Sequence, residues 1–134
     1  MRALVFGCTG QDGSLLCASL LRQGYEVVGV SRSRFVSHPS HQRLGIAAGI
    51  HYESADLCDF QEVLQLVQRH QPDEVYNLAA QSSVGVSFQE PVRTCSSIVN
   101  GTLNLLEVAR FESSSASWFF AGSSEMFGDV DGAI

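Results

Sequence analysis

The 134-residue sequence lacks the features that mark nucleic-acid-binding, membrane and secreted proteins. Basic residues are few, 8 against 14 acidic ones, and they are scattered, so neither a nucleic-acid surface nor a polybasic membrane patch is expected. No apolar run reaches the roughly 18 residues of a membrane span. The opening stretch, MRALVFG, is too short an apolar run for a secretory signal. These absences favour one cytoplasmic globular domain without nucleic-acid or membrane partners.

The cysteines and histidines lack the spacing of a metal site. No two cysteines form a C-x-x-C pair, which argues against bound zinc and favours free thiols. The histidines have no metal-ligand spacing and are expected to be surface or loop residues. These residues are Cys8, Cys17, Cys58 and Cys95, and His38, His41, His51 and His70. We therefore expect no metal, and we expect Cys8 to be a small packing residue.

Apolar runs and helix-like periodic segments alternate along the chain. Strands are expected at residues 4–6, 25–30, 50–56, 74–80 and 117–123. Helices are expected over 11–23, after Asp59, and over 91–110, with residues 31–49 mostly loop. Such alternation predicts an α/β fold in which a doubly wound parallel sheet carries helices on both faces. The expected strand order is 3-2-1-4-5.

Side-chain patterns support the last two helices. Asp59 and Glu62 have the spacing of a capping box at the start of one helix. Val99, Leu103 and Leu106 fall on one face of the other. Both helices are therefore expected to pack on the sheet.

Three glycines follow the first strand and open the first helix. Gly7, Gly10 and Gly13 stand in the stretch VFGCTGQDGS. In a dinucleotide site, such glycines permit a tight turn, a close approach of the pyrophosphate, and close packing of helix on strand. The helix amino terminus then faces the phosphates. The context predicts a Rossmann-type cofactor site; a structural turn without a ligand is the alternative.

The end of the second strand indicates which dinucleotide is bound. NAD sites usually carry an acidic residue there, bonding the ribose 2′-hydroxyl. This chain reads VSRSR instead, and Arg32 and Arg34 suit a 2′-phosphate. NADP is therefore the expected cofactor. The alternative is that both arginines are solvated loop residues.

Several longer stretches are specific enough to compare with known families: TGQDGS, ADLCD, QPDEVYNLAA, YNLAAQSSVGVSF, GTLNLLEVARF and AGSSEMFG. Together they resemble the GDP-mannose 4,6-dehydratase branch of the extended short-chain dehydrogenase/reductase family. The resemblance implies a cofactor site formed by Gly7, Thr9, Gly10, Gln11, Asp12, Gly13, Arg32, Asp56, Leu57, Leu78, Ala79, Ala80 and Ser82. Within that site, Asp56 is implied to contact the adenine amino group and Leu57 the adenine ring. Asp56 as a helix-capping acid is the alternative.

The resemblance also implies catalytic residues and a substrate. The family's Thr-x-Glu group is matched by Ser123-Ser124-Glu125. Ser123 would bond the reacting sugar oxygen and Glu125 would be the general base in dehydration of GDP-mannose. Glu125 as a solvated loop acid is the alternative. Arg93 stands where the family often has a tyrosine near the cofactor.

One family element is missing. The Tyr-x-x-x-Lys pair, which the family places on the helix after this point, does not occur. Residues 1–134 therefore resemble the NADP-binding, N-terminal part of a longer homo-oligomeric enzyme, expected to be inactive alone. A nucleotide-sugar epimerase or reductase, and a non-catalytic NADP-binding module, are the alternative functions.

Overall fold

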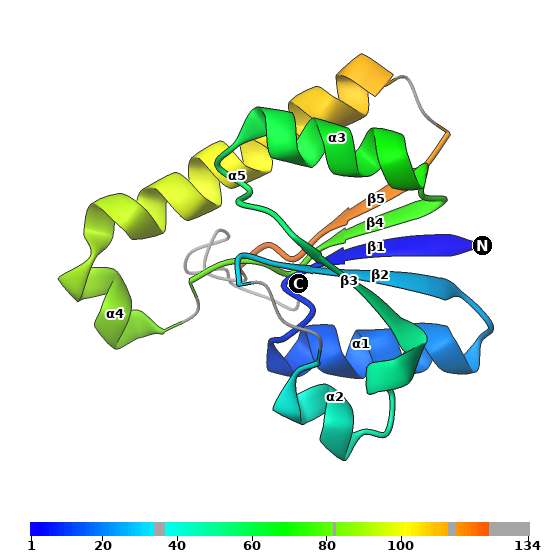
Figure 1. The fold of residues 1–134 in the computed structure, drawn as a ribbon. Helices are drawn as coiled ribbons and strands as arrows, with labels where there is room; N and C mark the ends of the chain where they lie inside the picture. Colours follow the sequence, from blue (N-terminus) through cyan, green and yellow to red (C-terminus); the bar gives the residue numbers. More distant parts are fainter. Residues whose placement is uncertain (34–36, 82, 113–114, 124–134) are drawn as a thin grey trace, which may run out of the picture.

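The computed structural model describes residues 1–33, 37–81, 83–112 and 115–123 of the chain. Within them, a single parallel sheet has the strand order β3-β2-β1-β4-β5 (Figure 1). The strands are β1 (Arg2–Phe6), β2 (Glu26–Ser31), β3 (Ile50–Ser54), β4 (Glu74–Asn77) and β5 (Ser117–Phe120). This confirms the predicted fold class and strand order.

Helices cover both faces of the sheet. Figure 1 shows α1 and α2 on one face and α3 and α5 on the other. The helices are α1 (Gln11–Arg22), α2 (Pro39–Arg43), α3 (Phe60–His70), α4 (Val84–Gln89) and α5 (Pro91–Glu112), with a 3₁₀ turn at Ala47–Gly49. No helix within the described ranges is long and apolar enough to cross a membrane.

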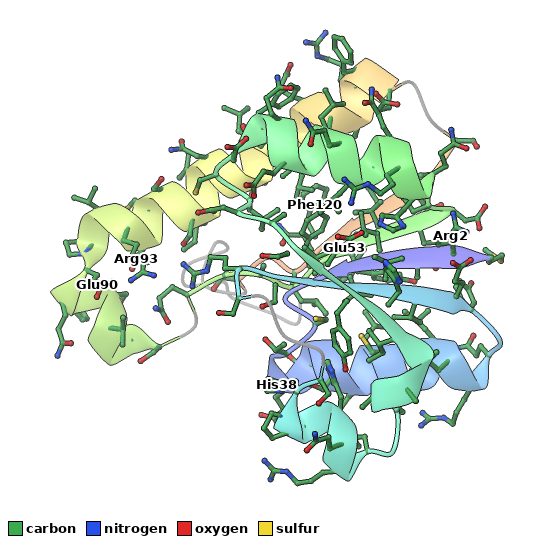
Figure 2. All side chains as sticks on the ribbon, viewed as in Figure 1. Arg2, His38, Glu53, Glu90, Arg93 and Phe120 are labelled. Carbon is green, nitrogen blue, oxygen red and sulfur yellow. The ribbon has the colours of Figure 1, made fainter. Side chains whose placement is uncertain are left out.

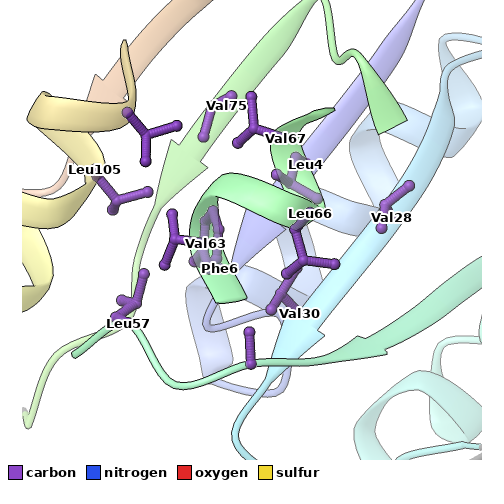
Figure 3. Close-up of a cluster of buried hydrophobic side chains, with 12 residues drawn as sticks. Leu4, Phe6, Val28, Val30, Leu57, Val63, Leu66, Val67, Val75 and Leu105 are labelled. Atoms are coloured by element: carbon purple, nitrogen blue, oxygen red, sulfur yellow. The ribbon is translucent and has the colours of Figure 1, made fainter. Parts of the chain in front are cut away.

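The core lies in two layers, one on each face of the sheet. The layer under α3 and α5 contains the larger cluster of buried apolar side chains (Figure 3). It contains Leu4, Phe6, Val28, Val30, Ala55, Leu57, Val63, Leu66, Val67, Val75, Leu105 and Val108. The layer under α1 contains Ala3, Val5, Cys8, Cys17, Leu20, Val27 and Ile50. Because parallel strands are covered on both faces, they consist of nearly continuous apolar runs.

The start of α3 forms half of the predicted capping box. The Asp59 Oδ1 accepts from the backbone N–H groups of Gln61 at 2.9 Å and Glu62 at 3.1 Å. The Glu62 carboxylate bonds the backbone N–H of Asp56 at 2.8 Å, and not that of Asp59. The same two side chains therefore fix both the helix start and the end of the loop before it.

The prediction of mostly loop over residues 31–49 is wrong in part. Helix α2 begins with Pro39, whose fixed φ suits the first helical position. The His38 side chain accepts from the backbone N–H of Ser40 and caps the helix. The polar composition of residues 31–49 gave no indication of this short helix. Helix α4 was not predicted either. Both are too short for their periodicity to be recognised.

Helix α5 packs through a different face from the one its large apolar residues indicated. Gly101, Leu105 and Val108 are buried, whereas Val99, Leu103 and Leu106 are 61%, 54% and 49% exposed. The reason is a close approach: a Cβ on Gly101 would lie 3.1 Å from the Leu57 Cβ. The glycine lets the helix contact the segment that follows β3.

Candidate functional site

The glycine turn lies at the carboxyl end of β1, the central strand. Gly7 has φ of +78°, in the left-handed region that favours glycine. Its N–H donates to the Val30 carbonyl at 3.1 Å, and its own carbonyl accepts from Gly10 at 3.0 Å. The Ser14 N–H then bonds the Gly10 carbonyl at 2.9 Å, which starts α1. The chain thus passes from strand to helix in one tight turn.

Two of the three glycines have no room for a side chain. A Cβ on Gly13 would lie 2.1 Å from the Gly7 carbonyl oxygen. One on Gly7 would lie 2.7 Å from the Leu78 carbonyl carbon, in the segment after β4. A Cβ on Gly10 would lie at an ordinary 3.4 Å from the Gly7 oxygen, and Gly10 is exposed. The turn is therefore packed tightly between the start of α1 and the segment after β4, and Gly10 lies on its solvent-exposed side.

The amino terminus of α1 is open to an anion. Its N-cap is Gly10, so no side chain bonds the first N–H groups of the helix. Thr9 is half-buried, and Gln11 and Asp12 are exposed around this helix end. Unsatisfied N–H groups and the positive end of the helix dipole favour phosphate here.

The segment after β4 lies beside the turn. The Leu78 N–H donates to the Phe6 carbonyl at 3.0 Å, and the Ala79 N–H to the Asn77 side-chain oxygen at 3.1 Å. Leu78 and Ala79 are half-buried, and Ala80 is exposed. The expected cofactor residue Ser82 lies outside the described residues. The structure thus brings the glycine turn and this segment together at the carboxyl edge of the sheet, where open α/β sheets bind ligands.

Arg32 lies one residue beyond β2 and is exposed. Its backbone carbonyl accepts from the Ser54 hydroxyl at 3.2 Å. No acidic partner pairs with its guanidinium among the described residues. Arg34 lies outside them. The positive charge of Arg32 is therefore available at the end of β2.

Asp56 and Leu57 follow the edge strand β3. The Asp56 carboxylate accepts from the backbone N–H of Cys58 at 2.9 Å, so it stabilises a local turn, whereas Asp59 caps α3. Leu57 is 8% exposed and belongs to the core layer under α5. The adenine contacts expected for both residues stay predictions.

The expected catalytic residues follow β5. Ser123 is exposed after the carboxyl end of this strand. Ser124 and Glu125 lie outside the described residues, so the role expected of Glu125 stays a prediction. Arg93, on α5, pairs with Glu90 at 2.9 Å on the exposed side of the helix (Figure 2).

Two of the four histidines expected at the surface or in loops are buried, so that expectation is wrong for both. His70, the last residue of α3, is 9% exposed. His41, on α2, is fully buried. Its Nε2 lies 2.7 Å from the Cys8 carbonyl oxygen and its Nδ1 lies 2.8 Å from the Tyr52 hydroxyl. Because a carbonyl only accepts, Nε2 carries the hydrogen and Nδ1 accepts from Tyr52. A neutral imidazole thus holds the glycine turn to β3.

The cysteines are free thiols, as predicted. Cys8 and Cys17 are buried under α1, and burial raises the pKa of each thiol to about 12. A thiol with so high a pKa carries almost no thiolate at neutral pH. Cys8 is therefore a small packing residue in the turn, as expected.

The fold and the candidate site together define the class of protein domain to which this chain belongs. A parallel sheet ordered 3-2-1-4-5, with a glycine turn at the carboxyl end of β1, is a Rossmann-type doubly wound domain. A family model described as GDP-mannose 4,6 dehydratase matches residues 4–133. The chain therefore belongs to the GDP-mannose 4,6-dehydratase family.

Curated relatives support this membership. The chain is 43% identical to a GDP-mannose 4,6-dehydratase of Sordaria araneosa, over 95% of its length and 24% of that protein's. It is 42% identical to GDP-mannose 4,6 dehydratase 2 of Arabidopsis thaliana, over 96% of its length and 37% of the relative's. The chain thus spans only about a quarter to two fifths of the relatives it matches.

Solved structures share the fold. A UDP-glucose-4-epimerase from Stenotrophomonas maltophila, with bound NAD and formylated UDP-arabinopyranose, matches with a TM-score of 0.82 and 30% identity, over 98% of this chain and 40% of the epimerase. A UDP-glucose 4-epimerase from Thermus thermophilus, in complex with NAD, matches with a TM-score of 0.72 and 32% identity, over 84% and 35% of the two chains.

Proposed function

We propose that residues 1–134 form the NADP-binding domain of a nucleotide-sugar dehydratase that acts on GDP-mannose. The observation that carries the proposal is the family match over residues 4–133. The glycine turn supports it, because the space that a Cβ on Gly7 or Gly13 would need is filled by backbone. The NAD-bound epimerase structures support a dinucleotide at the same place in the fold.

The described residues fit such a cofactor. The pyrophosphate would lie on the N–H groups at the start of α1, beside Gly10. Arg32, exposed and without an acidic partner in the described chain, would bond the 2′-phosphate and favour NADP over NAD. Leu78, Ala79 and Ala80 would line the nicotinamide side, together with Ser82 from outside the described residues, and Asp56 and Leu57 would line the adenine side.

The proposed reaction converts GDP-mannose to GDP-4-keto-6-deoxymannose. The bound nicotinamide would supply reversible hydride transfer, from sugar C4 and back to C6. The C4 hydroxyl would lose its proton to the family's Tyr-x-x-x-Lys pair, which the full-length protein would have to supply. Ser123 would donate a hydrogen bond to the C4 oxygen and hold the sugar at the carboxyl end of β5. The C4 ketone makes the C5 proton acidic, and Glu125 would take that proton as general base while water leaves from C6.

Glu125→Gln in the full-length protein tests this proposal. The amide keeps the size of the side chain but cannot accept the proton, so dehydration should fall by about 10²- to 10⁴-fold. Reduced-nicotinamide absorbance should still rise in a single turnover, because oxidation at C4 does not need the base. Glu90→Gln, an exposed acid on the same chain, is the control and should leave the rate unchanged. Dehydration at the wild-type rate in Glu125→Gln would overturn the base assignment.

An epimerase is the second candidate, because the solved epimerase structures match the fold closely. The two functions differ in their product. The purified full-length protein should release a 4-keto-6-deoxy sugar from GDP-mannose and should not interconvert UDP-glucose and UDP-galactose. The opposite result would assign the protein to the epimerases.

We also propose that the protein is a homo-oligomer that associates through α4 and α5. The exposed sides of these helices carry large apolar side chains, each at least 44% exposed. They are Val84, Phe88, Val92, Ile98, Val99, Leu103, Leu106 and Phe111. Light scattering on the full-length protein should give a mass of at least two chains, and a monomer at all concentrations would contradict this.

A further inference from the structure

Two histidines and a glutamate meet at the edge of the sheet, on the α3 side. His51 and Glu53 are two residues apart on β3, so their side chains point to the same face. His70 is the last residue of α3, which packs over that face. Figure 2 shows Glu53 between α3 and the sheet. None of these residues belongs to the glycine turn or to the expected cofactor site.

The three side chains aim their ligand atoms at one another. The Glu53 Oε1 lies 2.8 Å from the His70 Nε2 and 3.5 Å from the His51 Nε2. Each residue offers one ligand atom, and these three atoms all lie within 4.8 Å of one another. Tetrahedral zinc with bonds of about 2.0–2.2 Å needs its ligand atoms about 3.3 Å apart. Modest rotations of the exposed His51 ring would reach that geometry.

The types of ligand atom indicate which cation the site would bind. Two imidazole nitrogens and one carboxylate oxygen suit zinc and its transition-metal neighbours, whereas magnesium and calcium prefer oxygen ligands. The side chains of His70 and Glu53 are only 11% and 18% exposed, but that of His51 is 61% exposed. A fourth position therefore faces solvent and can hold water.

One neighbouring cation opposes the binding of a metal. The Arg69 Nη1 lies 3.1 Å from the same Glu53 oxygen. Its side chain is 59% exposed, so it can turn outward or bond the second carboxylate oxygen. The His70 Nε2 must carry a hydrogen when it bonds the carboxylate, because a carboxylate only accepts. That proton leaves to solvent when the nitrogen binds a cation.

From this arrangement we propose that His51, Glu53 and His70 form a binding site for one zinc ion, which links the edge strand β3 to the carboxyl end of α3. The expectation of no metal site considered spacing along the chain alone. Here the ligands come from two elements that only the fold brings together. The site is independent of the proposed cofactor and reaction.

Calorimetric titration of the full-length protein with zinc tests the site. Any affinity tag is removed, and Cys58→Ser and Cys95→Ser form the background, because both thiols are exposed and cysteine thiolates are zinc ligands. Total zinc bound is compared with that of His51→Ala, which should lose one equivalent or bind it at least about 10-fold more weakly. His38→Ala, a histidine outside the cluster, is the matched control and should bind as the background protein does.

Arg69→Ala sharpens the test. If the cluster binds zinc, removing the competing cation should tighten binding, and zinc should raise the melting temperature more than in the background protein. Magnesium at the same concentration should have no effect. Equal zinc binding by His51→Ala, His38→Ala and the background protein, or no tightening in Arg69→Ala, would overturn the proposal.

Discussion

The two faces of the sheet are packed in different ways. On β1, Leu4 and Phe6 point toward α3 and α5, whereas Ala3 and Val5 point toward α1. The layer under α3 and α5 contains more buried apolar side chains, among them Phe6 and four leucines. The layer under α1 contains fewer, and Ala3, Cys8 and Cys17 among them are small. A Cβ on Gly29 in this layer would lie 2.9 Å from the Ile50 Cγ2.

Because of this difference, one face of the sheet contributes mainly to the stability of the fold and the other mainly to the shape of the cofactor site. Because it contains more buried apolar side chains, the layer under α3 and α5 supplies more of the hydrophobic free energy. Small side chains let α1 approach the strands, which a short glycine turn requires. Buried polar bonds from His41 then fix the turn. Substitutions on the two faces should therefore affect different properties.

The largest effect on binding is expected at Gly7. Gly7 and Gly24 have φ of +78° and +81°, so alanine at either costs about 1–2 kcal/mol of backbone strain. Only Gly7 also lacks space, whereas a Cβ on Gly24 meets nothing within 4 Å. In the full-length protein, Gly7→Ala should abolish NADP binding in calorimetry and Gly24→Ala should not. Equal affinities would show that the turn does not hold the cofactor.

Leu105→Ala tests the other face. Removing this fully buried side chain should lower the free energy of unfolding by about 2–5 kcal/mol while NADP affinity stays within twofold. Leu44→Ala, at an exposed position after α2 and outside the proposed interface, should cost less than about 0.5 kcal/mol. Urea denaturation at low protein concentration measures both. A large loss of NADP affinity in stably folded Leu105→Ala would contradict the division between the faces.

Arg32→Ala tests the choice of cofactor at the end of β2. A hydrogen bond to a charged group contributes about 1.5–3 kcal/mol, so NADP should bind about 10- to 150-fold more weakly. Affinity for NAD should hardly change, and Arg43→Ala, on α2, should alter neither. If both cofactors lose affinity equally, Arg32 contacts a group that they share.

His41 should give the smallest effect, and one that depends on pH. His41→Leu loses two hydrogen bonds, which should cost about 1–3 kcal/mol of unfolding free energy. Burial lowers the pKa of His41 below its usual 6.5, opposed by its bond to Cys8 and aided by the charge of His38. The unfolded chain then binds the proton more readily, so stability falls as the pH drops below about 6.5.

His41→Gln separates the hydrogen bonds from the titration. Its amide N–H can replace the donor to the Cys8 carbonyl but cannot titrate. The variant should therefore lose less stability than wild type between about pH 7 and pH 5, as measured by urea unfolding. Identical pH profiles would show that His41 does not carry this dependence.

Most of the fold could be predicted because it depends on local patterns. The five apolar runs and the long helices have the periodicity of their elements, and the alternation of strand and helix leaves few topologies. The packing face of α5 could not be predicted, because Gly101 decides it through contact with Leu57, far away along the chain. The largest apolar residues of the helix, which indicated the other face, are exposed.

The candidate site likewise has a part that could be predicted from the sequence and a part that could not. The glycine turn is a local motif, so Gly7, Gly10 and Gly13 could be assigned from their spacing and flanking elements. The contact between Gly7 and Leu78 could not be derived from spacing, because it depends on the pairing of β1 with β4. Glu125 was assigned by resemblance and stays a prediction.

By itself, the sequence determined the order of strands and helices and the place of the glycine turn, because steric and hydrophobic preferences act over a few neighbouring residues. Only the tertiary structure decided which residues the histidine side chains contact. His41 meets Cys8 because α2 folds back under the turn. His51 and Glu53 meet His70 because the carboxyl end of α3 lies beside the edge strand β3. Contacts between residues 17 or more positions apart depend on how the elements pack, and no local pattern encodes them.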